Sequence, residues 1–291
     1  RRPNRKPPED SLREIDSSII TETIADLCVR ANTRLSPEQE QAVIRASAEE
    51  ISPTGRAVLS DIRENLETAV RKGLPICQDT GMTVVFLEVG QDVHIDGEPL
   101  EDAVNEGVGQ GYKKGWLRKS VVSDPLDRIN TGDNTPAVIH TRIVPGDRIR
   151  ITVMPKGFGS ENTSALKMLK PSDGEQGVED FVVEAVLKGA PNACAPVVVG
   201  VGIGGTFEKA AMLSKEALRT AAGVRHRKTR YADLEKRILD RIKDSGIGPM
   251  GLGGIETVLD VHIREYPTHI AGLPAAVNIC CYADRIAEKT I

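Results

Sequence analysis

Aromatic residues are scarce in this sequence, in which four Phe, four Tyr and one Trp make up 3% of 291 residues. A buried core must therefore be built mainly from Val, Ile, Leu and Ala. Basic residues are not in excess either, because 38 Lys and Arg stand against 42 Asp and Glu, a net charge of −4. That balance provides no electrostatic basis for binding nucleic acid or a membrane surface. No apolar stretch approaches the roughly 20 residues that a bilayer-spanning helix needs.

Cysteines are few, odd in number and widely scattered: Cys28, Cys77, Cys194, Cys280 and Cys281. This distribution argues against the disulfide framework that small secreted proteins use. We expect a reducing cytoplasm, in which the thiols are either buried or bound to metal. Cys28 lies on the apolar stripe of a helical pattern and is expected to be a small buried hydrophobe.

Helical patterns dominate the first 75 residues and then give way to strands mixed with helices. Helices are expected at 17–31, 36–51, 52–73, 101–116, 177–190, 206–221 and 230–244, and strands at 82–90, 92–100, 136–144, 147–157, 195–201, 255–266 and 275–283. The strands at 136–144 and 147–157 are expected to form a hairpin, with a Pro-Gly-Asp turn between them. Because the order lacks regular βαβ alternation, an α+β fold fits better than a doubly wound sheet.

The first 14 residues differ from the rest in being polar, proline-rich and basic. They carry no apolar segment of the kind that a secretory signal contains, and we expect a disordered lead-in or a tail that contacts a partner. Residues 15–291 are expected to form the folded domain, with a possible subdomain division near the loop at 170–176.

Three glycines, Gly200, Gly202 and Gly205, match the dinucleotide-binding pattern G-x-G-x-x-G between an expected strand and an expected helix. That fold also requires a second strand that ends in an acidic residue about 20 positions later. Here the helix leads into the basic segment Arg225–Arg230 and then into another helix. A nucleotide-binding oxidoreductase is therefore the less favoured alternative, and the basic segment is expected to be a solvated or partner-facing turn.

Polar and glycine-rich segments between apolar strands are the usual setting for functional loops. Cys77, Gln78 and Asp79 combine a soft metal ligand with hydrogen-bonding groups for a polar substrate. Arg118 carries a guanidinium fork that suits a carboxylate, and Gly159 allows backbone N–H groups to approach an anion. The competing interpretations are an ordinary turn with a buried thiol for the first segment and a surface ion pair for the arginine. The glycine-rich segment 246–254 is either a flexible connection or a close backbone wall around a ligand.

Three separated cysteine positions, Cys77, Cys194 and the pair Cys280 and Cys281, are compatible with a three-thiolate metal site. Such a set leaves one coordination position open, as Lewis-acid chemistry requires. Spacing alone leaves open a structural subunit in which the thiols are only buried side chains. His269 comes just before the strand that delivers the cysteine pair, and a lone histidine is usually structural or exposed.

Six ordered motifs together resemble the α subunit of class I iron–sulfur fumarate hydratases and tartrate dehydratases. They are CQDTG (77–81), LRKSVVSDPLDRINTGDNTPAVIH (117–140), PKGFGSEN (155–162), APVVVGVGIGGT (195–206), GIGPMGLGG (246–254) and CYADR (281–285). The resemblance covers nearly the whole chain from about residue 15. It implies that residues 15–291 form an α+β catalytic domain of the iron–sulfur hydro-lyase type.

The resemblance implies a [4Fe–4S] cluster held by Cys77, Cys194 and one cysteine of the final pair. The family's closing motif, C-x-A-x-R, assigns that position to Cys281, while Cys280 points to the opposite face of an extended segment. The fourth iron would carry no protein ligand and would bind the substrate. The glycines of 200–205 are then expected to form a tight turn near the cluster.

The resemblance also implies roles for the polar residues of these motifs. Asp79 would be the acid–base group, and Gln78, Arg118, Gly159 and His269 would contact or line the substrate. Further groups of the family's site, including a threonine base, belong to a second module or a separate β subunit. We therefore expect half of an active site in this chain and the other half in a β-subunit partner.

The activity implied is that of a fumarate hydratase α subunit, which with its β subunit adds water reversibly to fumarate and forms (S)-malate, as in the tricarboxylic acid cycle. The alternative within the family is a tartrate dehydratase α subunit, which converts tartrate to oxaloacetate and water. One hydroxyl group separates malate from tartrate. The contacts that distinguish the two substrates are expected to involve the second module.

Overall fold

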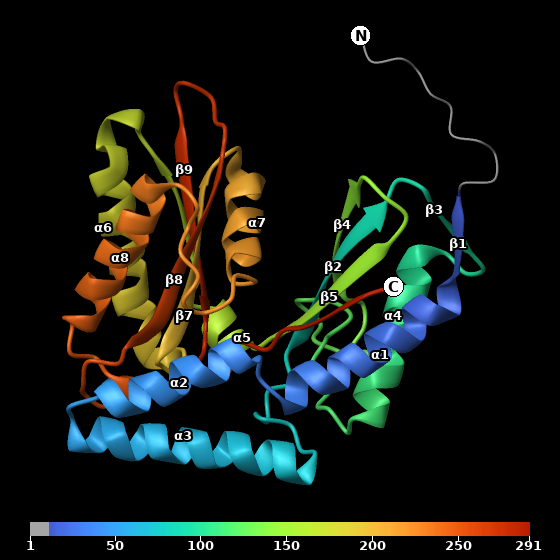
Figure 1. The fold of residues 1–291 in the computed structure, drawn as a ribbon, viewed down its shortest axis with the longest axis horizontal. Coiled ribbons are helices and arrows are strands. Elements are labelled where there is room, and N and C mark those ends of the chain that lie inside the picture. Colours follow the sequence, from blue (N-terminus) through green and yellow to red (C-terminus); the bar gives the residue numbers. More distant parts are fainter. Residues whose placement is uncertain (1–11) are drawn as a thin grey trace. The chain divides into compact units, whose positions relative to one another are not determined.

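The computed structural model describes residues 12–291, and the chain divides into two compact units (Figure 1). Unit 1 comprises residues up to Arg34, residues 73–156 and residues 285–291, and unit 2 comprises residues 35–72 and 157–284. Both units mix helices with sheets of mixed strand direction, which confirms the expected combination of helices and mixed sheets. None of the helices in residues 12–291 has the length and apolar character that a membrane span needs.

The expected lead-in and subdomain division relate to these units as follows. Residues 1–11 of the lead-in lie outside the described residues, and Arg13 and Glu14 begin strand β1 (Arg13–Asp16). Residues 170–176 lie inside unit 2, and the chain first passes from unit 1 to unit 2 at Arg34 and Leu35.

Unit 1 packs a four-stranded sheet against two helices. Its elements besides β1 are α1 (Ser17–Thr33), β2 (Met82–Gly90), β3 (Val93–Asp96), α4 (Leu100–Lys114), β4 (Val138–Val144), β5 (Ile149–Lys156) and β10 (Ala287–Thr290). Apolar residues of α1, α4, β2 and β5 form one buried cluster, and Cys28 is part of it, as expected. Burial raises the pKa of the Cys28 thiol to about 12. Gly107 lets α4 approach α1, because a Cβ there would lie 2.6 Å from the carbonyl oxygen of Thr21.

The expected hairpin between the strands at 136–144 and 147–157 is wrong. The sheet order is β10-β5-β2-β4, so β2 lies between β4 and β5 and pairs with both. The connection between β4 and β5 passes over the end of β2, where Gly90 N donates to Arg148 O at 2.8 Å. A Cβ at Gly90 would lie 2.3 Å from Gly146 O, so the missing side chain allows this crossing.

Unit 2 contains a second four-stranded sheet, in the order β6-β9-β7-β8, and most of the helices. Its elements are α2 (Pro37–Glu49), α3 (Pro53–Lys72), α5 (Phe158–Glu161), β6 (Ala165–Leu169), α6 (Gly174–Gly189), β7 (Val197–Gly204), α7 (Phe207–Ala217), α8 (Thr229–Lys243), β8 (Val258–Tyr266) and β9 (Leu273–Cys280), with 3₁₀ turns η1 (Pro171–Asp173), η2 (Ala190–Asn192) and η3 (Pro249–Gly251). Helices α6 and α8 cover one face of the sheet and α7 covers the other (Figure 1).

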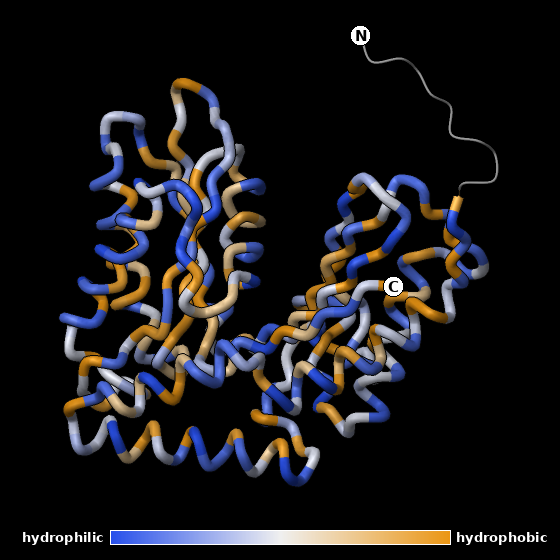
Figure 2. Tube along the Cα trace, viewed as in Figure 1, coloured by the Kyte–Doolittle hydropathy of each residue, from blue (hydrophilic) through white to orange (hydrophobic). Residues whose placement is uncertain are grey.

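Local sequence signals explain the helices α2 and α3. Ser36 caps α2 by accepting a hydrogen bond from Gln39 N at 3.2 Å, as the capping-box pattern predicts. In α3, apolar residues recur at helical intervals (Figure 2), and Leu59, Ile62 and Leu66 are buried.

The expectation that the glycines of 200–205 form a turn is only partly right. Gly200 and Gly202 lie inside strand β7, and only Gly204 and Gly205 adopt the positive φ angles of a turn. A Cβ at Gly202 would lie 2.1 Å from Ala210 O in α7, and the same distance separates a Cβ at Gly200 from its nearest α7 oxygen. The two strand glycines therefore allow close packing of α7 on β7, and they do not form a phosphate-binding loop.

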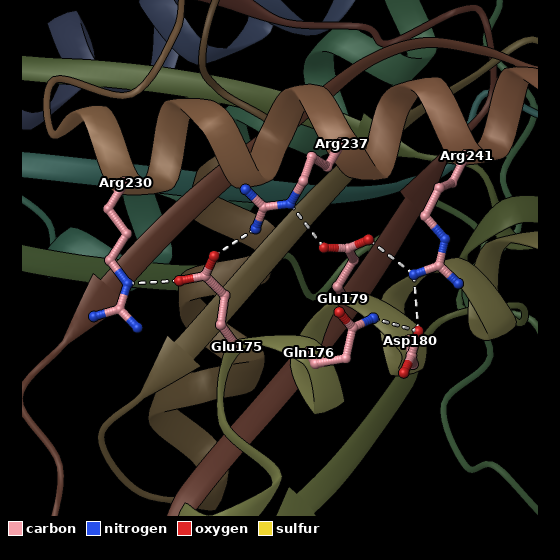
Figure 3. Close-up of polar contacts among 7 residues, drawn as sticks. All are labelled: Glu175, Gln176, Glu179, Asp180, Arg230, Arg237 and Arg241. Carbon is pink, nitrogen blue, oxygen red and sulfur yellow. Dashed lines mark hydrogen bonds and ion pairs between the residues drawn. The ribbon is translucent and has the colours of Figure 1, made fainter.

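An ion-pair ladder joins α6 to α8 (Figure 3). Arg237 pairs with Glu175 and donates from Nε to Glu179 at 3.0 Å. Arg241 donates to Glu179 at 2.9 Å and to Asp180 at 2.8 Å. Glu179 therefore holds two arginines of α8 while its own side chain is almost fully buried.

Candidate functional site

The segment Cys77–Gly81 precedes β2 in unit 1 and contains three of the expected site residues. Cys77 and Asp79 are half-buried, and Gln78 is exposed. The backbone just before the segment is fixed to α1, because Ile76 N donates to Asn32 O at 2.8 Å. The loop thus presents a thiol, an amide and a carboxylate, and its first residue follows a backbone position that is anchored to α1.

Hydrogen bonds fix the course of this loop. Asp79 Oδ1 accepts from Gly81 N at 3.0 Å, which closes a tight Asx-type turn. Thr80 Oγ1 donates to the carbonyl oxygen of Arg118 at 2.7 Å. Gly81 has a φ of +76°, and a Cβ there would lie 2.8 Å from the backbone of Lys156. These contacts bring Asp79 and Arg118 into neighbouring segments of unit 1.

Two buried polar side chains, Tyr112 and Asn134, donate hydrogen bonds to backbone carbonyl groups of the Cys77–Gly81 loop. The Tyr112 hydroxyl lies 2.6 Å from Thr80 O and 3.0 Å from Gly81 O. Asn134 Nδ2 donates to Gly81 O at 3.1 Å, while its Oδ1 accepts from Ser120 N at 2.7 Å. Burial raises the pKa of Tyr112 above its usual range, so the phenol stays protonated and donates.

Arg285 completes this set of anchors. Its Nη1 donates to the carbonyl oxygen of Asp79 at 2.6 Å and to Asn32 Oδ1 at 3.0 Å, and the residue is 2% exposed. Arg285, Tyr112 and Asn134 anchor the candidate loop, and the sequence analysis did not predict any of them. The arginine that ends the CYADR motif was the available signal for Arg285.

Arg118 follows α4 on an exposed stretch of unit 1. Within residues 12–291 no hydrogen bond or ion pair engages its guanidinium, although its carbonyl oxygen anchors Thr80. The arginine is therefore held by its backbone beside the Cys77–Gly81 loop while its fork stays available for an anion.

Three segments of unit 2 meet around Cys194. Cys194 is exposed with a φ of +52° and follows η2. The neighbouring Ala195 O accepts from Met250 N of the glycine-rich segment at 2.9 Å. Gly159 is the second residue of α5, and a Cβ there would lie 4.0 Å from Asn192 O. Gly159 and Cys194 are thus brought to one region of unit 2, with the 246–254 segment beside them.

A buried carboxylate anchors the glycine-rich segment. Glu50 is fully buried, and its oxygens accept hydrogen bonds between 2.8 and 3.1 Å long from four backbone N–H groups, those of Ile51, Ser52, Ile255 and Glu256. Burial opposes its charge, but these N–H groups together lower the pKa of the Glu50 carboxyl. A Cβ at Gly254 would lie 2.5 Å from Glu50 Oε2, so the segment can approach only as glycine.

The two neighbouring cysteines at the end of β9 differ in their surroundings. Cys280 is 3% exposed and lies opposite Val198 in the antiparallel register of β7 and β9. Cys281 follows the strand and is half-buried. Because β7 starts shortly after Cys194, the same register brings Cys281 to the Cys194 end of the sheet in unit 2.

His269 lies elsewhere in unit 2. It is exposed in the turn between β8 and β9, where its Nδ1 accepts from Ala271 N at 3.2 Å. The end of β8, Tyr266, pairs with Gly204 at the end of β7, whereas Cys194 precedes the start of β7. With about 3.3 Å per residue, the length of β7 separates the two ends of this sheet by roughly 23 Å. Unit 2 by itself does not bring His269 to Cys194.

The expected metal ligands are divided between the two units. Cys77 lies in unit 1, and Cys194 and Cys281 lie in unit 2. In the described part of the chain no three His, Cys, Asp or Glu side chains form a group that could hold a metal ion. None of the five cysteines forms a disulfide within residues 12–291.

Comparison with known proteins decides the family. A family model described as fumarate hydratase (fumerase) matches residues 21–290. The chain belongs to the fumarate hydratase family. All six motifs and all of the expected site residues lie within the matched range. The resemblance inferred from the motifs is confirmed, and the chain is a member of a hydro-lyase family.

Individual relatives in the fumarate hydratase family cover most of the chain. A protein of Methanocaldococcus jannaschii named "Putative L(+)-tartrate dehydratase subunit alpha" is 41% identical over 279 residues, which are 94% of this chain and 97% of that protein. The L(+)-tartrate dehydratase subunit alpha of Escherichia coli strain UTI89 is 34% identical over 270 residues, 91% of this chain and 88% of that protein. The protein of the same name in E. coli strain K12 has the same identity and coverage.

Proposed function

We propose that this chain is the α subunit of an iron–sulfur hydro-lyase that acts on a four-carbon dicarboxylate. The observation that carries the proposal is the anchored Cys77–Gly81 loop, which presents a thiol, an amide and a carboxylate beside the backbone of Arg118. Membership of the fumarate hydratase family supports it. Loss of water from a hydroxy dicarboxylate needs groups of these types, namely a binder for a carboxylate, an acid–base group and an electrophile for the hydroxyl.

We propose that Cys77, Cys194 and Cys281 hold a [4Fe–4S] cluster. The donor set fits, because thiolates are the usual ligands of such clusters and these three cysteines are the accessible ones. Cys28 and Cys280 are buried and are proposed to stay thiols. Within unit 2, the shared sheet end of Cys194 and Cys281 supports their joint role. When bound, a cluster with one iron lacking a protein ligand supplies a Lewis acid for the substrate hydroxyl.

The remaining chemistry belongs to side chains. Arg118 binds one substrate carboxylate through its guanidinium fork, which fixes the orientation of the carbon chain. Gln78 and the backbone of Gly159 contact substrate oxygens. Asp79, whose Oδ1 is oriented by Gly81 N, transfers a proton at the reacting centre. The proposal that His269 lines the site rests on its motif alone.

Two substrates are proposed for this site. Fumarate hydration to (S)-malate is supported by the description of the family model. Tartrate dehydration is equally supported, because relatives at 34% and 41% identity carry that name. Both reactions break or form a carbon–oxygen bond next to a carbon that bears a carboxylate, so the groups named above serve either substrate.

A β subunit is proposed as the partner that supplies the remaining catalytic groups. The relatives are each named as subunit alpha, which supports a second subunit here. A reducing cytoplasm is the proposed location, which agrees with five cysteines that form no disulfide within residues 12–291. Residues 15–291 are proposed as the catalytic domain of this subunit.

The test is an anaerobic assay of the reconstituted chain with its β subunit, on fumarate and on tartrate in parallel. Asp79→Asn and Arg118→Ala are expected to lower kcat/KM for the preferred substrate at least 100-fold, with Arg118→Ala also raising KM. Arg142→Ala is the matched control, because Arg142 is an exposed arginine of β4 in the same unit. Wild-type activity in the Asp79 and Arg118 variants would refute the proposed roles, and inactivity of the wild type on both substrates would refute the function.

A further inference from the structure

The connection between α7 and α8 crosses the open edge of the sheet in unit 2. Because α7 and α8 cover opposite faces, the chain between them passes around β8, the edge strand (Figure 1). This connection carries residues 225–228 of the basic segment Arg225–Arg230, whose last two residues begin α8. The sequence predicts a solvated or partner-facing turn for the segment. The proposed hydro-lyase chemistry does not use it.

Two buried carboxylates fix the connection against β8. Asp260 accepts from Gly223 N at 2.6 Å and pairs with the Arg225 guanidinium. Glu235 accepts from His226 N at 3.0 Å and from Ile263 N at 2.8 Å. Asp260 is 2% exposed and Glu235 1% exposed, so neither contact competes with water. The basic segment is therefore pre-organised, and backbone groups of the edge strand are satisfied at the same time.

A cavity of about 370 Å³ lies between this segment and β8. Its walls carry four basic side chains, Arg225, His226, Arg227 and Arg264, and two acidic ones, Glu235 and Glu265.

The charges around the cavity do not cancel. Arg225 pairs with Asp260 and lies 3.7 Å from Glu235, and Glu265 accepts from both Lys228 and His226 at 2.8 Å. The guanidinium groups of Arg227 and Arg264 have no ion pair or hydrogen bond within residues 12–291. Two guanidinium groups thus remain at the cavity without an ion-pair partner.

We propose that this cavity binds a small multivalent oxyanion, a phosphate or a polycarboxylate, between Arg227 and Arg264. Guanidinium forks bind such oxygens in pairs, and a pre-organised segment loses little conformational entropy on binding. Arg264 pairs in register with Gly202, five residues beyond the first residue of β7, so it lies roughly 16 Å along the strand from the Cys194 end. The proposed site is therefore separate, within unit 2, from the cysteines, and it does not depend on the proposed reaction.

The direct test is calorimetric titration of the full chain with inorganic phosphate at constant ionic strength. One saturable site per chain is expected. The double variant Arg227→Ala/Arg264→Ala should weaken binding at least 10-fold, and Arg264→Lys should weaken it less, because lysine keeps the charge but lacks the fork. Arg45→Ala, an exposed arginine of α2 in the same unit, is the control and should bind like wild type.

Two further measurements locate the site and identify the source of the anion. Phosphate should slow amide hydrogen exchange in residues 220–228 of the wild type and leave the double variant unchanged. Competition with glycerol phosphate and with tricarballylate at matched ionic strength distinguishes a phosphate ester from a polycarboxylate. Absence of saturable binding, binding unaffected in the double variant, or protection confined to residues outside 220–228 would each overturn the proposal.

Discussion

Arg285 donates a hydrogen bond of 2.6 Å from Nη1 to the carbonyl oxygen of Asp79, 206 residues earlier in the chain. The same nitrogen donates to Asn32 Oδ1, so one buried guanidinium ties the last segment of unit 1 to α1 and to the proposed catalytic loop. This relationship gives the arginine of the CYADR motif a role of its own: it positions the backbone of Asp79.

Arg285→Ala removes the donor from two acceptors at once. The free energy of unfolding should fall by roughly 2–3 kcal/mol, because buried acceptors lose their partner. Hydrogen exchange in residues 77–81 should accelerate as the loop loosens. Arg285→Lys should retain part of the stability that Arg285→Ala loses. Arg142→Ala is the control, and its free energy of unfolding should equal that of the wild type. A Cys77–Gly81 loop that exchanges at the wild-type rate in Arg285→Ala would contradict the positioning role.

Glu50 offers a second test, because its carboxylate accepts from four backbone N–H groups next to the glycine-rich segment. Glu50→Gln turns one acceptor oxygen into an NH₂ group that faces N–H donors. Unfolding free energy, measured by urea denaturation, should fall by roughly 1–3 kcal/mol. Glu49→Gln is the control, since Glu49 is the exposed neighbour and, within residues 12–291, its carboxylate has a single ion pair, the 3.5 Å one with Lys243. Equal effects of the two substitutions would argue against the anchor.

The same carboxylate predicts a pH dependence. The pKa of Glu50 is lowered in the folded chain, with burial opposing and the backbone N–H groups producing the net decrease. The unfolded chain therefore binds the proton more readily, and stability falls as the pH drops below the ordinary glutamate pKa of about 4.5. Urea midpoints between pH 5 and pH 3 should fall more steeply for wild type than for Glu50→Gln. If the urea midpoints of wild type and Glu50→Gln fell in parallel with decreasing pH, groups other than Glu50 would control the loss of stability in acid.

Gly202→Ala tests the close packing of α7 on β7. The added Cβ would lie 2.1 Å from Ala210 O, so helix and strand must separate. Thermal denaturation should show a loss of roughly 2–4 kcal/mol, in the range of overpacked cores. Gly109→Ala in α4 is the matched control: its Cβ meets nothing closer than 3.8 Å, and alanine favours the helix by roughly 0.5–1 kcal/mol. A tolerated Gly202→Ala would restore the possibility of a loop function for these glycines.

The ion-pair ladder between α6 and α8 should respond unequally to substitution (Figure 3). Glu179→Gln weakens contacts with both Arg237 and Arg241 from a side chain that is 7% exposed, and should cost about 1–2 kcal/mol. Arg230→Ala removes only a pair whose arginine is 72% exposed, and the melting temperature should stay unchanged. A larger loss in Arg230→Ala than in Glu179→Gln would contradict this distribution of stability.

Local features of the fold could be predicted from the sequence, and non-local ones could not. The Ser36 cap and the apolar spacing of α3 act within a few residues, so α2 and α3 were predicted correctly. The insertion of β2 between β4 and β5 depends on a strand that precedes both, and the turn pattern alone suggested a hairpin. Gly200 and Gly202 match a loop motif, but their role is set by α7 on the other side of a strand.

The candidate site shows the same limit. The motifs indicated Cys77, Asp79 and Arg118 as candidates because each lies in a short polar segment. The anchors Tyr112 and Arg285 reach the loop through folding, and neither their spacing nor their neighbours in the sequence reveal the acceptor that each one contacts. The location of His269 at the far end of β7 from Cys194 also follows only from strand register.

The central claim is the three-thiolate cluster, and iron and sulfide content after anaerobic reconstitution with the β subunit tests it most directly. Single Ser variants at Cys77, Cys194, Cys280 and Cys281 are compared with wild type, together with their absorption spectra. The account predicts about four irons per α chain in wild type and in Cys280→Ser, and loss of the cluster in the other three variants. A wild type that takes up no iron, or full iron content in any of those three variants, would contradict it.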